Sequence, residues 1–167
     1  MALWPQSPEV APVRTNIQKY TMTIAYGGEI GIGLMMAKGL AKAGAKKVYI
    51  LGRRKETLEK AASEHGSIIP LVCDVTSKDS LRSVVDTIAE DIGYVNLVVA
   101  NSGVFGPAQS HDPSLSIQEL RKRLFDDVPM EDFTATLNIN VTAAYFTSLA
   151  FLELLDAGKP QAETLLK

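Results

Sequence analysis

The chain has little of several things that define whole classes of protein. It contains one cysteine, Cys73, so it cannot form an internal disulfide. Its two histidines, His65 and His111, are far apart in loop-like surroundings, and with one thiol they make no metal-ligand cluster. No apolar run approaches the roughly 18 residues that cross a bilayer. The first residues also lack the basic and apolar regions of a secretory signal, so we expect a cytoplasmic protein.

The chain also lacks an excess of charge of either sign. The 17 basic and 19 acidic residues give a net charge of −2, which gives no reason to expect nucleic acid or an acidic membrane as a partner. With 46% hydrophobic and 22% charged residues, the composition is that of an ordinary globular domain. The proline-rich start predicts a loose tail over 1–16. The domain is then expected at 17–159, followed by a tail at 160–167.

Strand-like and helix-like segments alternate along the domain. The expected strands are 21–25, 47–51, 67–73 and 95–100, and the expected helices are 32–43, 54–64, one capped by Thr76, a short one at 117–124, and a long one at 131–156. Pro70 suits an edge strand, whereas 95–100 is apolar enough to be buried on both faces. Gly158 and Pro160 are expected to end the last helix. This pattern predicts an α/β, Rossmann-type doubly wound parallel sheet of order 3-2-1-4, truncated after the fourth strand and the long helix.

A glycine-rich turn follows the first strand. Gly27, Gly31 and Gly33 have the spacing G-x-x-x-G-x-G between a strand and a helix. Gly27 lets the chain turn off the strand, since glycine tolerates positive φ. Gly31 leaves room for a pyrophosphate, and Gly33 lets the helix pack closely with its N-terminal amides toward the anion. The turn therefore predicts a nucleotide site.

Two arginines occupy the position that reads the ribose in such sites, about 20 residues beyond the glycines. Arg53 and Arg54 stand where an acidic residue would accept hydrogen bonds from a ribose 2′-hydroxyl. Because an arginine can instead bind a 2′-phosphate, we expect NADP, with NAD the less favoured cofactor. The alternative is that both are solvated residues at a helix start, which suits Arg54 better than Arg53.

Four short motifs occur in a recognisable order. After the glycine turn come Cys73-Asp74-Val75-Thr76, Ala100-Asn101-Ser102-Gly103 and Asn138-Ile139-Asn140-Val141. Together they resemble the short-chain dehydrogenase/reductase family from about Thr21 to Gly158. The helix containing 35–40 and the Gly52-Arg53-Arg54 turn resemble the branch common in fungal secondary metabolism.

The resemblance implies roles in binding the cofactor. Asp74 would accept a hydrogen bond from the adenine amino group, and Val75 would line the same pocket. Asn101 and Gly103 would shape the end of the fourth strand beside the phosphates and ribose. Ile32 would offer its backbone amide near the diphosphate. The alternative for Asp74 is a helix-preceding cap, worth about 1 kcal/mol.

Asn140 matches the family's active-site asparagine, which kinks the long helix and holds a water in a proton relay. The alternative is a helix residue whose side chain is satisfied by backbone. Two departures are expected to disturb the phosphate turn. Tyr26 stands where the family usually has threonine, and Glu29 places a carboxylate inside the loop.

A third departure concerns catalysis. The family uses a serine and a Tyr-x-x-x-Lys pair, and none of the five tyrosines here has lysine four residues on. The resemblance implies an NADP-dependent oxidoreductase that interconverts a small carbonyl and an alcohol by hydride transfer, with the catalytic pair missing from this chain. The alternatives are a non-catalytic nucleotide-binding or dimerisation module, or an inactive truncated product. Exposure of the fourth strand and the long helix also predicts self-association or pairing with a complete relative.

Overall fold

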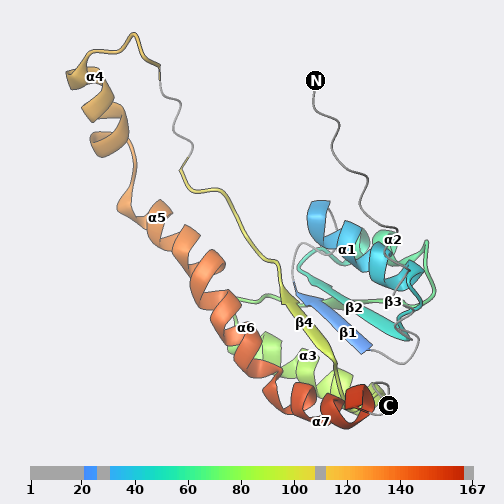
Figure 1. Cartoon of the computed structure of the whole chain (residues 1–167). Coiled ribbons are helices and arrows are strands. Elements are labelled where there is room, and N and C mark those ends of the chain that lie inside the picture. Colours follow the sequence, from blue (N-terminus) through green and yellow to red (C-terminus); the bar gives the residue numbers. More distant parts are fainter. Residues whose placement is uncertain (1–20, 26–30, 108–111, 164–167) are drawn as a thin grey trace, which may run out of the picture.

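Four parallel strands form the centre of the computed structural model, which describes residues 21–25, 31–107 and 112–163. The strand order is β3-β2-β1-β4, and helices cover both faces of the sheet (Figure 1). The strands are β1 (Thr21–Ala25), β2 (Lys47–Gly52), β3 (Ile68–Val72) and β4 (Leu97–Ala100). The α/β class, the parallel sheet and the predicted strand order are confirmed.

The helices complete the alternation expected from the sequence. They are α1 (Gly31–Lys42), α2 (Lys55–Ala62), α3 (Lys78–Asp91), α4 (Ile117–Arg121), α5 (Met130–Leu137), α6 (Ala144–Ala150) and α7 (Leu152–Glu163). Two stretches are π-helical, η2 (Lys122–Asp126) and η3 (Asn138–Ala143). In Figure 1, α1 and α2 lie on one side of the sheet, and α3, α6 and α7 lie on the other.

Strand β2 divides the hydrophobic core into two halves. Val48 and Ile50 pack with α1 and α2, whereas Tyr49 and Leu51 pack with α3, α6 and α7. Successive side chains of a strand point to opposite faces, so an unbroken apolar run is needed where both faces are covered. All four of these side chains are at most 1% exposed. The apolar run from Val48 to Leu51 therefore specifies a central strand.

Strand β4 is less buried than its sequence suggests. Leu97 is 39% exposed, and the other residues of the strand are only partly buried. The expectation that it would be covered on both faces is wrong. The physical reason is position: β4 pairs with β1 on one side and stands at the edge of the described sheet on the other. The same observation confirms the exposed edge.

The start of α3 differs by one residue from the prediction. Ser77, not Thr76, is the N-cap, and its hydroxyl oxygen accepts from the Ser80 amide at 3.3 Å. Thr76 instead donates both its amide and its hydroxyl to Asp74. In the sequence Thr76 and Ser77 are equally suitable N-cap residues. Because the Thr76 hydroxyl is engaged by Asp74, Ser77 is the one that caps the helix.

The predicted long helix is interrupted and also runs further than expected. It breaks at Phe151, where α6 gives way to α7 with a bend of 48°. The helix continues beyond Gly158 and Pro160 to Glu163, so the predicted end is wrong. Among the described helices none is by itself long and apolar enough to span a membrane, although the bent pair 130–150 and 152–159 passes that test by length and composition.

Contacts with the two residues before β4 explain why α7 continues. The Asn96 side chain donates to the Gly158 carbonyl at 2.9 Å, and the Val95 amide donates to the Leu154 carbonyl at 2.9 Å. Gly158 is buried against this segment. These tertiary contacts therefore stabilise α7 beyond the point at which its sequence favours the end of the helix.

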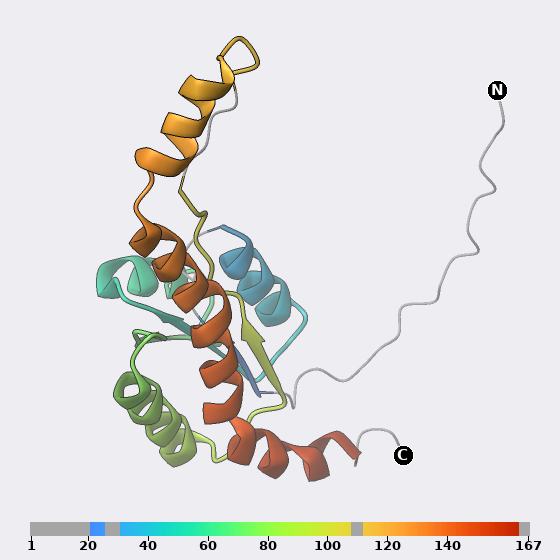
Figure 2. The same ribbon diagram turned by 90° about the vertical axis from the view of Figure 1, so that its left-hand side faces the viewer.

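Helix α4 and η2 form an arm that projects away from the sheet (Figures 1 and 2). A capping box starts the arm: Ser116 accepts from the Glu119 amide, and the Glu119 carboxylate accepts from the Ser116 amide. None of the residues in α4 or η2 is buried. The predicted short helix is confirmed, and it extends two residues further, to Asp126.

Candidate functional site

The carboxyl ends of the four strands meet at one edge of the sheet. In the strand register Ala25 lies opposite Ala100, and Gly52 lies opposite Val72. The loops and the first residues of the helices that follow these strands carry most of the predicted site residues, which are Gly31, Ile32, Arg53, Arg54, Asp74, Val75, Asn101 and Gly103. The order of the strands reverses between β1 and β4, and ligands of open α/β sheets bind in the crevice at that point.

The first residue of α1 leaves space at this edge. Gly31 has φ of +65°, a conformation that favours glycine, and a Cβ built there would meet no atom of the described residues within 4 Å. Gly33 is buried two residues on, so α1 packs closely. Ile32 is 70% exposed. Gly27 lies outside the described residues, as do Tyr26 and Glu29.

Asp74 follows β3, and one of its two carboxylate oxygens is hydrogen-bonded. Its Oδ1 accepts from the Thr76 amide at 3.0 Å and from the Thr76 hydroxyl at 2.7 Å. These bonds, together with the nearby charge of Arg53, hold the pKa of Asp74 below its usual value. Within the described residues Oδ2 accepts no hydrogen bond. The carboxylate is therefore ionised and has one oxygen available to a donor.

The residues flanking Asp74 are core residues. Cys73 is fully buried and Val75 is 2% exposed. Burial raises the pKa of the Cys73 thiol, which is typical of a structural cysteine. The Asp74 amide donates to the Ser80 hydroxyl at 2.9 Å, which ties the loop to α3. Hydrogen bonds thus hold Asp74 both at its backbone amide and at one oxygen of its side chain.

Asn140 joins the long helix to the loop after β4. Its Oδ1 accepts from the Val104 amide at 2.8 Å, and its Nδ2 donates to the Val104 carbonyl at 2.9 Å. A Cβ added at Gly103 would lie 3.5 Å from the same Oδ1. Asn140 stands in the π-helical η3, a conformation often found at functional sites. The sharp bend of the helix is at Phe151, not at Asn140.

We expect Asn140→Ala to release the loop after β4. Val104 is 39% exposed, so water can replace part of what is lost, and the expected cost is about 1 kcal/mol of unfolding free energy. Hydrogen exchange of the Val104 amide should accelerate by about fivefold, because that cost sets the local opening equilibrium. Asn138→Ala, in the same π-helical turn, is the control. Equal Val104 exchange in both variants would contradict this assignment.

One tyrosine takes no part in the strand-end site. Tyr49 lies in the core, and its hydroxyl donates to Asp91 at 2.5 Å. Burial and the Asp91 carboxylate raise the Tyr49 pKa further above its ordinary value, so this tyrosine is no acid or base. Arg54 is the N-cap residue of α2. Within the described residues no group of three or more metal-ligating side chains comes together.

Two residues that hold the site loops in place were not predicted from the sequence. Ser80 anchors the Asp74 amide, and Val104 takes both hydrogen bonds of Asn140. The Asp-x-Thr spacing at Asp74 is typical of local side-chain-to-backbone bonding and could have identified the Thr76 contact. No sequence signal points to Val104, because its backbone and not its side chain makes the contact.

Comparisons with known proteins cover the same segment. The family model "short chain dehydrogenase" matches residues 21–162. The short-chain dehydrogenase/reductase SAT3 of Stachybotrys chartarum is 59% identical over 128 residues, covering 76% of this chain and 47% of that protein. PhomF of Diaporthe leptostromiformis, also described as a short-chain dehydrogenase/reductase, is 48% identical over 141 residues, covering 82% and 47%. The chain spans about half the length of the curated relatives it matches.

Solved structures agree on the fold. A short-chain type dehydrogenase/reductase from Mycobacterium marinum has a TM-score of 0.68 at 25% identity, covering 87% of this chain and 55% of that one. An NAD⁺-bound xylitol dehydrogenase has a TM-score of 0.67 at 28% identity, covering 82% and 48%.

Proposed function

The chain belongs to the short-chain dehydrogenase/reductase family, and from that premise we propose that its strand-end crevice is the cofactor half of an NADP-dependent oxidoreductase. The observation that carries the proposal is the open space at Gly31, on the same sheet edge as the anchored carboxylate of Asp74. The fungal relatives support a place in secondary metabolism.

The residues present fit a dinucleotide. Gly31 provides the approach to the diphosphate, and the first amides of α1, including that of Ile32, supply donors for it. Asp74 has an oxygen available for the adenine amino group, and the buried Val75 fixes the loop beneath it. Gly27, Asn101 and Gly103 complete the proposed set. The cofactor, when bound, supplies the hydride.

Arg53 is the proposed reader of the 2′-phosphate. It follows β2 at the strand-end edge, and its charge contributes to the low pKa of Asp74 across the neighbouring loop. A guanidinium beside the adenine-binding carboxylate is well placed to pair with the extra phosphate of NADP. Arg54, the N-cap residue of α2, is the second and weaker candidate for binding the 2′-phosphate.

The proposed substrate is a small carbonyl compound or alcohol. Asn140 is the proposed catalytic residue of this chain, and its two bonds to Val104 orient the loop that faces the crevice. The proton donor and its lysine are not among the 167 residues, since no tyrosine here has a lysine four positions on. Turnover would therefore need those groups from outside this sequence.

NADPH binding tests the proposal directly. The wild-type chain should enhance NADPH fluorescence with saturation, whereas Gly31→Ala should bind at least about tenfold more weakly. An alanine at φ of +65° costs about 1 kcal/mol, and its methyl group points into the space for the diphosphate. Gly66→Ala, also without a neighbour within 4 Å but not at positive φ, is the control. Absence of saturable binding by the wild type would refute the cofactor site.

An exposed apolar stripe favours a second role, as a dimerisation module. The stripe runs along α5, η3, α6 and the first residue of α7, and its members are between 42% and 82% exposed. They are Met130, Phe133, Leu137, Val141, Tyr145, Leu149 and Leu152. The spacings are three, four, four, four, four and three, which read the same in both directions about Val141.

This symmetry suits an antiparallel pair of identical helices with Val141 on the two-fold axis. Phe133 would then face Leu149, and Leu137 would face Tyr145 of a second copy. Seven side chains of this kind present roughly 700 Å², near the about 800 Å² that each partner contributes to a standard interface. We therefore propose that the chain pairs with itself along this stripe.

Light scattering at several protein concentrations tests the pairing. The wild type should approach twice the monomer mass of 18.1 kDa, and Val141→Glu should remain monomeric because the two-fold axis would bring like charges together. Met35→Glu, an exposed position on α1 outside the stripe, should dimerise like the wild type. A wild-type chain that stays monomeric at high concentration would exclude the dimer.

A further inference from the structure

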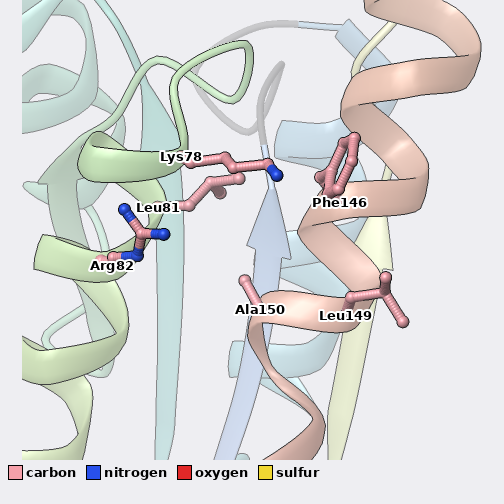
Figure 3. A pocket seen from close by; sticks show the side chains of 6 residues that line it. All are labelled: Lys78, Leu81, Arg82, Phe146, Leu149 and Ala150. Atoms are coloured by element: carbon pink, nitrogen blue, oxygen red, sulfur yellow. The ribbon is translucent and has the colours of Figure 1, made fainter.

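A cavity of about 230 Å³ opens between α3 and α6, apart from the strand-end loops (Figure 3). It is lined by Lys78, Leu81 and Arg82 of α3 and by Phe146, Leu149 and Ala150 of α6. Two lining residues are cationic, four are apolar, and none is acidic. We propose that this cavity binds a single-ring aromatic carboxylate, a ligand unrelated to the proposed cofactor.

The two cationic residues of the cavity favour an anionic ligand. The Lys78 side chain reaches across from α3, and its ammonium nitrogen lies 4.2 Å from the centre of the Phe146 ring (Figure 3). Within the described part of the chain Lys78 forms no ion pair. Arg82 pairs with Asp79 at 2.6 Å, but both side chains are largely exposed, and such pairs contribute little. A carboxylate at the mouth would therefore gain two cationic partners while displacing only a weak contact.

The apolar walls of the cavity favour an aromatic ring. Leu81 is 2% exposed, and Phe146 and Ala150 are partly buried members of the same core cluster. An apolar cavity of about 150 Å³ holds benzene. The cavity here, at about 230 Å³, therefore has room for one aromatic ring with a carboxylate. The Phe146 face or edge supplies an aromatic contact in addition to the buried area.

Other ligand classes use only part of this arrangement. An inorganic anion such as phosphate would leave the Leu81 and Ala150 surface in contact with water. A neutral aromatic compound would leave the Lys78 ammonium without an anionic partner. Only a compact molecule with both a ring and a carboxylate matches the two cations and the apolar walls together.

Benzoate is the probe, measured by saturation-transfer difference NMR on the full chain, with benzamide as its neutral counterpart. A ligand of this size should bind with a dissociation constant on the order of 1 mM. Benzamide should bind at least about fivefold more weakly, and Lys78→Gln should weaken benzoate by a similar factor because one charge-assisted bond is lost. Ala150→Leu should abolish binding by filling the cavity. Circular dichroism confirms that each variant is folded.

Arg121→Gln is the matched control. The Arg121 guanidinium lies 4.8 Å from the Phe125 ring centre, which reproduces a cation over an aromatic ring on the exposed arm, away from the cavity. Benzoate binding should be unchanged in this variant. Equal binding of benzoate and benzamide, or benzoate binding that survives both Lys78→Gln and Ala150→Leu, would overturn the proposal, as would no benzoate signal in the wild type. NADPH binding is measured on the same samples, so failure of this site is separable from failure of the cofactor site.

Discussion

Replacing Arg53 by aspartate should weaken NADPH binding by about 100-fold, equivalent to about 2.8 kcal/mol. The change removes a charge-assisted pairing with the 2′-phosphate and places a carboxylate beside that dianion, so loss and repulsion add. NADH lacks the phosphate, and its binding should be retained or improved, since a carboxylate can accept from the ribose 2′-hydroxyl. Fluorescence titration with both nucleotides gives the ratio of affinities, measured at one fixed ionic strength because salt screens such contacts.

Arg54→Asp is the control for this experiment. It makes the same change of charge one residue further on, at the N-cap position of α2. Long-range repulsion alone should weaken NADPH by no more than about threefold, since exposed charges are screened over a Debye length of about 8–10 Å. If Arg53→Asp lowers the affinity for NADPH and NADH equally, Arg53 does not distinguish the two cofactors, and the NADP preference is wrong.

Gly158→Ala should cost about 2–3 kcal/mol of unfolding free energy. A Cβ at this position would lie 2.2 Å from the Val95 carbonyl oxygen and 3.0 Å from the Val95 carbonyl carbon. Both are backbone atoms, so no side-chain rotation can relieve the clash, and overpacking of this kind typically costs 1–3 kcal/mol. Movement of α7 would also break the bond from Asn96 to the Gly158 carbonyl. Urea unfolding followed by circular dichroism measures the loss.

Gly39→Ala gives the opposite expectation. Gly39 lies inside α1, and a Cβ there would meet nothing within 4 Å. Alanine in a helix interior is favoured over glycine by about 0.5–1 kcal/mol, so this variant should unfold at a higher urea concentration. A Gly158→Ala chain as stable as the wild type would mean that α7 is not held against Val95 and Asn96.

Most of the fold could be predicted because its signals are local. The apolar run at 48–51 specifies a central strand, and the spacing of Leu81, Val84 and Ile88 places the buried face of α3. Strand order follows from the doubly wound Rossmann topology once the alternating elements are known. The end of the last helix was not predictable in this way. Gly158 and Pro160 locally favour a stop, and contacts with Val95 and Asn96, more than 60 residues earlier in the chain, override that preference.

The sequence by itself determined which residue types stand at the strand ends: the glycines before α1, the arginines after β2, Asp74 after β3 and Asn140 in the long helix. Side-chain chemistry and spacing along one chain carry that information. Only the tertiary structure decided their partners, because those partners are backbone groups and cavities. The pairing of Asn140 with Val104 and the cationic cavity between α3 and α6 both require segments far apart in the sequence that meet only through folding, and no local pattern of residues records such contacts.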